Sequence, residues 1–230
     1  MADGAAVCVC ILFYGAGEKY LKLAQRVLNA PMRDLAAQNV EFRFGCNAVG
    51  DSTAAFLREQ IDKHFHRAIV FEQPVNLFKY PMMRRMVHSL PITAPITMWF
   101  DHDSHLDADL DVARWIGRIT QQLSGCDMIG SVQRSGLKPE HADWLKNQEW
   151  HGGKEPGRYV SHAVSSWWAI NTPLLYQYNW PAPDLKQKDG DVLFGELFKQ
   201  NDLLLCHFRD GVLININDAG VEAAVSRTMV

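Results

Sequence analysis

Strand-like and helix-like segments alternate through the first half of the chain, and this alternation limits the fold more than any other feature. Short apolar runs rich in β-formers are each followed by a segment whose apolar residues recur with helical spacing. A strand that returns to the next strand through a helix forms a parallel sheet with helices on its faces. The predicted class is therefore α/β, a single Rossmann-like domain with a mostly parallel central sheet and helices on both faces.

The same patterns give approximate bounds for each element. The expected strands are 6–15, 40–47, 67–74, 96–100, 127–134, 159–170, 203–208 and 212–217. The expected helices are 18–31 (ended by Pro31), 51–65, 80–90, 107–123 (capped by Asp107), 172–178 and 191–201. Residues 135–159 turn polar and glycine-rich, which predicts a long loop of the kind that often carries function.

Composition narrows the class of protein. The chain has 230 residues, enough for one large domain, and 47% of them are hydrophobic, which excludes a disordered chain. A net charge of -3 gives no general attraction for polyanions, although it leaves room for a local basic patch. The five cysteines form no CxxC pair, as in reduced proteins of the cytosol. The apolar run 5–14 is too short to span a bilayer, so we expect a soluble, cytoplasmic protein.

The fourth predicted strand ends in carboxylates. Ile96 to Phe100 are apolar or β-prone, and Asp101, His102 and Asp103 follow at once. Residues i and i+2 of an extended chain face the same way, so Asp101 and Asp103 can reach one point, where they repel unless a cation lies between them. Mg²⁺ and Mn²⁺ favour such oxygens, and ligands of open α/β sheets bind at this edge. The motif alone fits either a metal-phosphate site or a solvated turn.

Together with motifs elsewhere, this stretch resembles the GT-A-fold glycosyltransferases, in particular the family-two group that uses nucleotide sugars. The matching segments, in order, are FYGAGEKYL, GCNAVGDST, DHD, SSWWAINTPLL and KDGDVLFGELFKQNDLLLCHF, and they cover nearly the whole chain. The resemblance implies a nucleotide-sugar-binding half at residues 1–107 and an acceptor-binding half, with a smaller sheet, at 108–230. It also implies Mn²⁺ or Mg²⁺ as cofactor and a nucleotide-diphosphate sugar, first of all a UDP-sugar, as donor.

The resemblance further implies residue roles. Asp101 and Asp103 would bind the metal with His207, and Asp191 would be the catalytic base. Because Gly190-Asp191 stands where the family has Glu-Asp, Asp189 is a second candidate base. The side chains implied in donor binding are Tyr14, Asn47, Asp51, Lys79, Arg84, Arg85 and His102. Asn47 departs from the acidic residue usual at its position, which leaves recognition of the base open.

Several of these residues also have ordinary structural interpretations. Asp191 could cap a helix, His207 could be a satisfied strand-end histidine, and Arg84 with Arg85 could form a solvated helix face. Aromatic residues are usually core, yet aromatic faces also stack on sugars and nucleobases. On that ground the predicted acceptor contacts are Trp144, Trp150, Trp167 and Trp168.

The predicted function is metal-dependent transfer of a sugar from a nucleotide-diphosphate sugar to an acceptor hydroxyl, with inversion as the family default. The acceptor is either a saccharide or glycoconjugate, or a hydroxymethylated pyrimidine in DNA. The basic run KYPMMRR, with Arg134 and Lys138, could serve the second of these. Two alternatives remain: a HAD-like phosphatase with Asp101 as nucleophile, and a non-catalytic sugar- or nucleotide-binding module.

Overall fold

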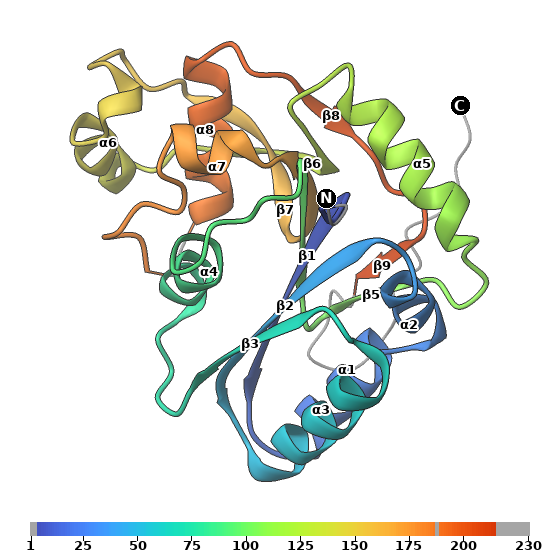
Figure 1. Ribbon diagram of the computed structural model, residues 1–230. Helices are drawn as coiled ribbons and strands as arrows, with labels where there is room; N and C mark the ends of the chain where they lie inside the picture. Colours follow the sequence, from blue (N-terminus) through green and yellow to red (C-terminus); the bar gives the residue numbers. More distant parts are fainter. Residues whose placement is uncertain (1–3, 187–188, 215–230) are drawn as a thin grey trace.

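The computed structural model describes residues 4–186 and 189–214, and a seven-stranded sheet runs through its centre (Figure 1). Its strand order is β3-β2-β1-β4-β7-β6-β8, and β5 and β9 pair separately as a small antiparallel sheet. The strands are β1 (Val7–Gly15), β2 (Val40–Val49), β3 (Ala68–Gln73), β4 (Ile96–Asp101), β5 (Ser104–Leu106), β6 (Met128–Gly136), β7 (Tyr159–Asn171), β8 (Leu205–His207) and β9 (Val212–Ile214). The predicted fold class, with a mostly parallel sheet, is confirmed.

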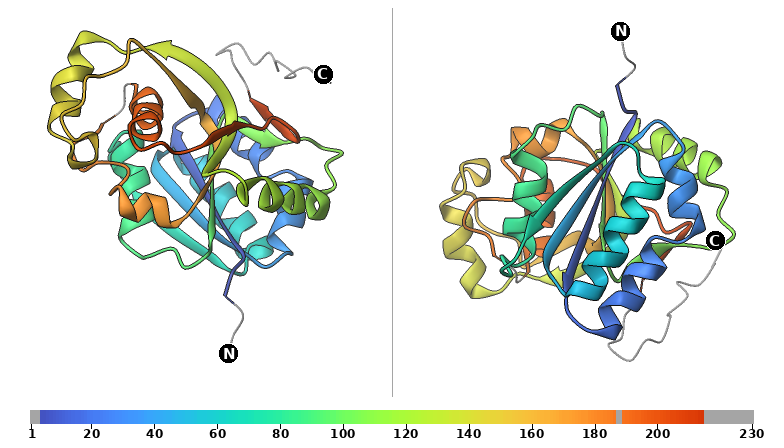
Figure 2. Two further views of the ribbon diagram at one scale, coloured as in Figure 1. Left: turned by 90° about the horizontal axis from the view of Figure 1, so that it is seen from above. Right: turned by 60° about the horizontal axis from the view of Figure 1, so that its bottom comes forward.

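The helices lie on both faces of the sheet. They are α1 (Glu18–Val27), α2 (Ala30–Ala36), α3 (Asp51–His64), α4 (Lys79–His88), α5 (Val112–Leu123), α6 (Pro139–Lys146), the short 3-10 helix η1 (Glu149–His151), α7 (Pro173–Gln177) and α8 (Gly190–Gln200). Figure 2 shows α1 and α3 on one side of the parallel strands and α4 on the other. Within the described ranges, no helix has both the length and the apolar character needed to cross a bilayer.

Alternation along β1 divides the hydrophobic interior into two cores. Its odd-numbered residues from Val7 to Phe13 pack with α1, α2, α3 and α5, and its even-numbered residues from Cys8 to Leu12 pack with α4, α7 and α8. A strand buried on both faces reads as a continuous apolar run, as this one does. The second core lies directly beneath the helices that carry the candidate catalytic residues.

Strand direction gathers the polar residues at one edge. β1, β2, β3 and β4 are parallel, so their carboxyl ends lie together, with Leu12 opposite Asp101 and Tyr14 opposite Asn47. β7 runs antiparallel to β4 with Trp167 opposite Phe100, which brings the residues just before Trp167 to the same edge. The end of β4 is therefore bordered by segments that are far apart in the sequence.

Three predicted elements are wrong in detail. The helix expected at 18–31 is two helices, because Asn29 accepts a hydrogen bond from Met32 N (3.1 Å) and Pro31 is tolerated in the first turn of α2. Asp111 rather than Asp107 caps α5, through Arg114 N (3.1 Å).

The loop expected at 135–159 contains α6 and η1. α6 begins at Pro139, a residue suited to the first turn of a helix. Residues 215–217 of the last predicted strand lie outside the described residues. One continuous sheet spans both predicted halves of the chain, so the division at residue 107 stays a prediction about ligands.

The contact between α8 and β7 leaves no room for a side chain at Gly195. A Cβ there would lie 2.4 Å from the Ser161 carbonyl oxygen and 2.7 Å from His162 Cβ. We expect Gly195→Ala to lower the free energy of unfolding by about 1–3 kcal/mol, because the backbones must separate. Chemical denaturation measures this effect.

Gly117→Ala is the matched control, because a Cβ at Gly117 in α5 has nothing within 4 Å. The control should raise stability by up to about 1 kcal/mol, since alanine is the better helix former. Equal effects of the two substitutions would contradict the packing described for α8.

Candidate functional site

Asp101 ends β4 with both carboxylate oxygens engaged. Its Oδ1 accepts a hydrogen bond from Trp99 Nε1 (2.8 Å), and its Oδ2 forms an ion pair with Lys79 Nζ. The Lys79 ammonium also donates to the Ser165 carbonyl oxygen (2.8 Å). Both charged side chains are more than four-fifths buried, so the pair is weakly screened by solvent.

Asp103 is also partly buried, and its carboxylate is not fully satisfied. Its Oδ1 is buried without a hydrogen-bond partner. Burial, and then the negative charge of Asp101, raise the pKa of the Asp103 carboxyl to about 6, while the charge of Lys79 opposes the rise. The two carboxylates repel each other, and one oxygen of Asp103 has no hydrogen-bond partner. A cation bound between them would offset the repulsion.

This donor set fits a hard divalent cation whose remaining ligands are water or phosphate oxygens. Among residues 4–186 and 189–214, no third histidine, cysteine, aspartate or glutamate joins the two carboxylates in a metal-binding group. A cation at this place would have the carboxylates of Asp101 and Asp103 as its candidate protein ligands.

His207, the third predicted metal ligand, lies apart from the two carboxylates. It lies on β8 opposite Gly130, and β6 and β7 separate β8 from β4. Three strand spacings correspond to about 14 Å. The His207 side chain instead accepts a hydrogen bond from Val132 N (3.2 Å), so it is a strand-end histidine that satisfies a backbone donor.

Asn47 positions Lys79 through the loop before α4. Its side-chain amide donates to Asn76 Oδ1 (2.9 Å) and to the Phe78 carbonyl oxygen (3.2 Å), and its Oδ1 accepts from Leu77 N (2.9 Å). Because these contacts use both ends of a nearly fully buried amide, Asn47 supports the loop rather than presenting hydrogen bonds to a nucleotide. This differs from its predicted donor role.

The two arginines of α4 lie away from the carboxylates. Arg84 donates to Asn179 Oδ1 (3.0 Å) and to the Pro181 carbonyl oxygen (2.6 Å), and Arg85 donates to Gln73 Oε1. Neither lines the pocket beside Lys79. Their predicted role as phosphate ligands is not supported by this arrangement, and Lys79 is the member of the basic run that reaches the candidate metal site.

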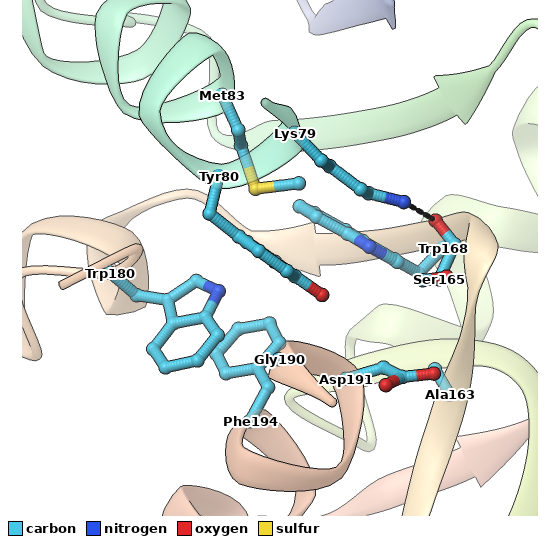
Figure 3. Close-up of a pocket in the computed structure, with 10 residues that line it drawn as sticks. All are labelled: Lys79, Tyr80, Met83, Ala163, Ser165, Trp168, Trp180, Gly190, Asp191 and Phe194. Atoms are coloured by element: carbon cyan, nitrogen blue, oxygen red, sulfur yellow. Dashed lines mark hydrogen bonds between the residues drawn. The ribbon is translucent and has the colours of Figure 1, made fainter. Parts of the chain in front are cut away.

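A small pocket with four aromatic side chains in its wall, the aromatic pocket, joins Lys79 to Asp191 (Figure 3). Its volume is about 10 Å³, room for a single water molecule. Trp180 and Phe194 stack face to face at its base, with centroids 4.4 Å apart. The lining residues are Lys79, Tyr80, Met83, Ala163, Ser165, Trp168, Trp180, Gly190, Asp191 and Phe194.

The pocket also explains the state of Tyr80. Burial, and then the carboxylates of Asp191 and Asp101, raise the pKa of the Tyr80 hydroxyl well above its usual value. Tyr80 is therefore a neutral phenol at physiological pH, and Figure 3 shows its hydroxyl inside the pocket near Asp191. Tyr80, Trp180 and Phe194 were not among the predicted site residues, because buried aromatics carry no sequence signal that separates a pocket wall from core.

The structure distinguishes Asp191 from Asp189. The Asp191 carboxylate lines the pocket, with Oδ1 accepting from Val192 N (3.0 Å) and Oδ2 3.7 Å from His162 Nε2. Asp189 is held outside the pocket by Lys138 Nζ (2.5 Å) and His141 Nε2 (3.2 Å). These geometries favour Asp191 as the group that can meet a substrate.

Of the remaining predicted donor residues, His102 and Tyr14 lie together, and Asp51 lies apart from them. Burial lowers the pKa of His102 to about 4, so its ring is neutral, and it packs against Tyr14 with centroids 4.2 Å apart. Tyr14 is 43% exposed at the end of β1. Asp51 begins α3 and lines a separate cavity of about 440 Å³ between α3 and β3, which shares no residue with the aromatic pocket.

The predicted acceptor tryptophans divide into three positions. Trp167 is a core residue, 1% exposed and packed against Phe100, Trp115 and Phe208, a position that does not support its predicted acceptor contact. Trp168 lines the aromatic pocket.

Trp150 lines a different open cavity of about 590 Å³, with Tyr178 and several amide side chains. Trp144 is partly buried behind it, with ring centroids 6.2 Å apart. A half-buried aromatic side chain bordered by amides is suited to a sugar ring, so these two tryptophans remain predicted contacts.

The fold is that of GT-A glycosyltransferases. A mannosyltransferase from Pyrobaculum calidifontis, solved with GDP-Man and Mn²⁺, matches 91% of this chain and 56% of its own at 15% identity, with a TM-score of 0.56. GalNAc-T7, solved with UDP, GalNAc and Mn²⁺, matches 88% of this chain and 41% of its own at 13% identity, with a TM-score of 0.59. The chain thus spans about half the length of these glycosyltransferases, and the likeness shows the fold.

The same fold also occurs with other chemistry. The 4-diphosphocytidyl-2C-methyl-D-erythritol synthase from Anaerococcus prevotii matches 89% of this chain and 87% of its own at 11% identity, with a TM-score of 0.50. No protein-family model matches the sequence, and no curated protein sequence does. Function must therefore be inferred from the site.

The contacts of Asp189 predict a pH-dependent contribution to stability. The hydrogen bond from Lys138 lowers the pKa of the Asp189 carboxyl in the folded state. Its stabilising effect is therefore complete above the unfolded pKa, about 3.9, and is lost as the pH falls through the lower folded value.

We expect Asp189→Asn to lower the free energy of unfolding at pH 7 by up to about 1 kcal/mol, as for an exposed ion pair. Urea denaturation at pH 7 and at pH 3 measures the effect, and the difference from wild type should be smaller at the lower pH. An equal loss at both pH values would contradict the ionic origin of the contribution.

Proposed function

We propose that this protein is a metal-dependent glycosyltransferase that moves a sugar from a nucleotide-diphosphate sugar to an acceptor hydroxyl. One observation carries the proposal: Lys79 binds Asp101 of the candidate metal site and also lines the pocket that holds Asp191. A diphosphate held at the carboxylates and a hydroxyl held at Asp191 would therefore meet across a single side chain.

Asp101 and Asp103 would hold Mn²⁺ or Mg²⁺, which when bound supplies positive charge to a departing diphosphate. The glycosyltransferases of the same fold that were solved with Mn²⁺ and a nucleotide support this assignment. On the protein side, Asp191 accepts the proton of the attacking hydroxyl, and His162 Nε2 lies 3.7 Å from the carboxylate oxygen. The aromatic walls keep bulk water from the reacting atoms.

Inversion at the anomeric carbon is part of this proposal. The candidate base and the candidate diphosphate site lie on different elements, Asp191 on α8 and Asp101 on β4. Attack by a hydroxyl at Asp191 on the face of the sugar opposite the diphosphate would invert the configuration. We take a UDP-sugar as the first donor to test.

The two alternative functions receive less support. In a HAD-like phosphatase the Asp-x-Asp motif ends the first strand, whereas here it ends β4 of a GT-A sheet. A non-catalytic binding module would not require a carboxylate beside the metal site, yet Asp191 lines the pocket that Lys79 shares.

The acceptor is proposed first as a saccharide or glycoconjugate. Trp150 and Tyr178 border an open cavity together with uncharged amides, a composition suited to sugar hydroxyls. A hydroxymethylated pyrimidine in DNA is the second candidate, because Arg134 and Arg158 both lie over the ring of Tyr159, which is 47% exposed. Arginine and an exposed aromatic ring together suit phosphate and base contacts.

Asp191→Asn should reduce nucleotide-sugar turnover by about 10²-fold or more, because the general base is removed while size is kept. Asp189→Asn is the matched control and should keep its activity. Release of nucleoside diphosphate, measured with UDP- and GDP-sugars in the presence of Mn²⁺, reports both variants. Activity that survives Asp191→Asn and is lost in Asp189→Asn would assign the base to the other residue.

Asp101→Asn and Asp103→Asn should each abolish turnover, and EDTA should do the same to the wild type. The same assay, run with oligosaccharides and with DNA containing hydroxymethylcytosine or hydroxymethyluracil, identifies the acceptor. Turnover that persists in both variants and in EDTA would contradict a metal-dependent mechanism. An acyl-phosphate on Asp101 would support the phosphatase instead.

A further inference from the structure

We propose that Lys79 is a resident cation of the Asp101–Asp103 site, which a divalent metal must displace from Asp101 and which then becomes available to a diphosphate. This inference rests on the proposed function in that it takes the two aspartates as the metal ligands. It adds a competition between a side chain and the metal, and a coupling between metal and nucleotide.

Lys79 contacts a carboxylate oxygen that a metal ion would use as a ligand. Its ammonium pairs with Asp101 Oδ2, while Asp101 Oδ1 is already engaged by Trp99 Nε1 at 2.8 Å. Both oxygens of Asp101 are therefore already engaged while the lysine stays in place, and a cation would have to compete with its ammonium for Oδ2. The orphaned Oδ1 of Asp103 is the unsatisfied buried oxygen that remains at the site.

The backbone and side-chain contacts of Lys79 hold its ammonium beside Asp101 in this structure. Its backbone begins α4 immediately after a loop that Asn47 holds with three hydrogen bonds. Its side chain is only 15% exposed, and the ammonium also binds the Ser165 carbonyl oxygen at 2.8 Å. A lysine held from both sides neutralises Asp101 when no metal is bound.

Lys79 also lines the pocket that contains Asp191. A lysine has a flexible four-carbon stem, so its ammonium can leave Asp101 while the backbone at the start of α4 stays in place. A diphosphate bound at the carboxylates would give the displaced ammonium a new anionic partner. Metal and nucleotide should therefore bind with positive coupling, each raising the affinity for the other by the same factor.

The experiment measures binding of Mn²⁺ by the electron paramagnetic resonance signal of the free ion. The samples are the wild type and Lys79→Met, each without nucleotide and with saturating UDP. Lys146→Met is the matched control, because Lys146 also pairs with an aspartate, Asp143 at 3.3 Å, but lies on α6 and does not line the pocket. Lys79→Gln serves as a second variant, since its amide can still donate to Ser165.

Without nucleotide, the Lys79 variants should bind Mn²⁺ at least about tenfold more tightly than the wild type, on the scale that a neighbouring opposite charge has for a carboxylate. UDP should raise the Mn²⁺ affinity of the wild type more than that of the variants, and Lys146→Met should behave as wild type. Folded Lys79 variants with unchanged or weaker Mn²⁺ binding would overturn the competition.

Asp103→Asn in the wild-type and Lys79→Met backgrounds separates this failure from failure of the proposed function. If it removes Mn²⁺ binding while Lys79→Met leaves the affinity unchanged, the metal site stands and the role of Lys79 is wrong. If it leaves Mn²⁺ binding unchanged in both backgrounds, the ion binds elsewhere, and both the metal site and the competition are wrong.

Discussion

Asp101 and Asp103 lie two residues apart at the end of a buried strand, where low exposure strengthens the repulsion between their charges. Two contacts of Asp101 offset this repulsion: an ion pair with Lys79, which begins α4, and a hydrogen bond donated by Trp99. The same lysine lines the pocket of Asp191. Lys79 therefore connects the two carboxylates of the candidate metal site with the candidate base.

The sequence predicted those features that depend on local pattern. Strand β4 and its two aspartates follow from an apolar run that ends in acidic residues, and the parallel sheet follows from alternating elements. The position of His207 depends on which strands lie between β8 and β4, which no local pattern encodes. From the sequence, Asn47 could bind a ligand. Only the structure shows that its side-chain amide is already hydrogen-bonded to the loop before α4.

The likeness in fold is shared by enzymes of different chemistry, so it orients the proposal without deciding it. Glycosyl transfer is favoured by the way the functional groups lie near one another. Two carboxylates could hold a cation, Asp191 lies in the aromatic pocket, and Lys79 contacts Asp101 and lines that pocket. Asp189 shows how such a site separates roles, since Lys138 and His141 hold it outside the pocket while Asp191, two residues later, lines it.

The most direct test of the central claim is anomalous diffraction at the manganese edge from crystals grown with Mn²⁺ and a nucleoside diphosphate. The structure predicts a manganese peak within about 2.5 Å of a carboxylate oxygen from both Asp101 and Asp103, with the Lys79 ammonium turned away from Asp101. A bound nucleotide with its manganese peak elsewhere, and with Lys79 still paired to Asp101, would contradict the claim that these carboxylates hold the catalytic metal.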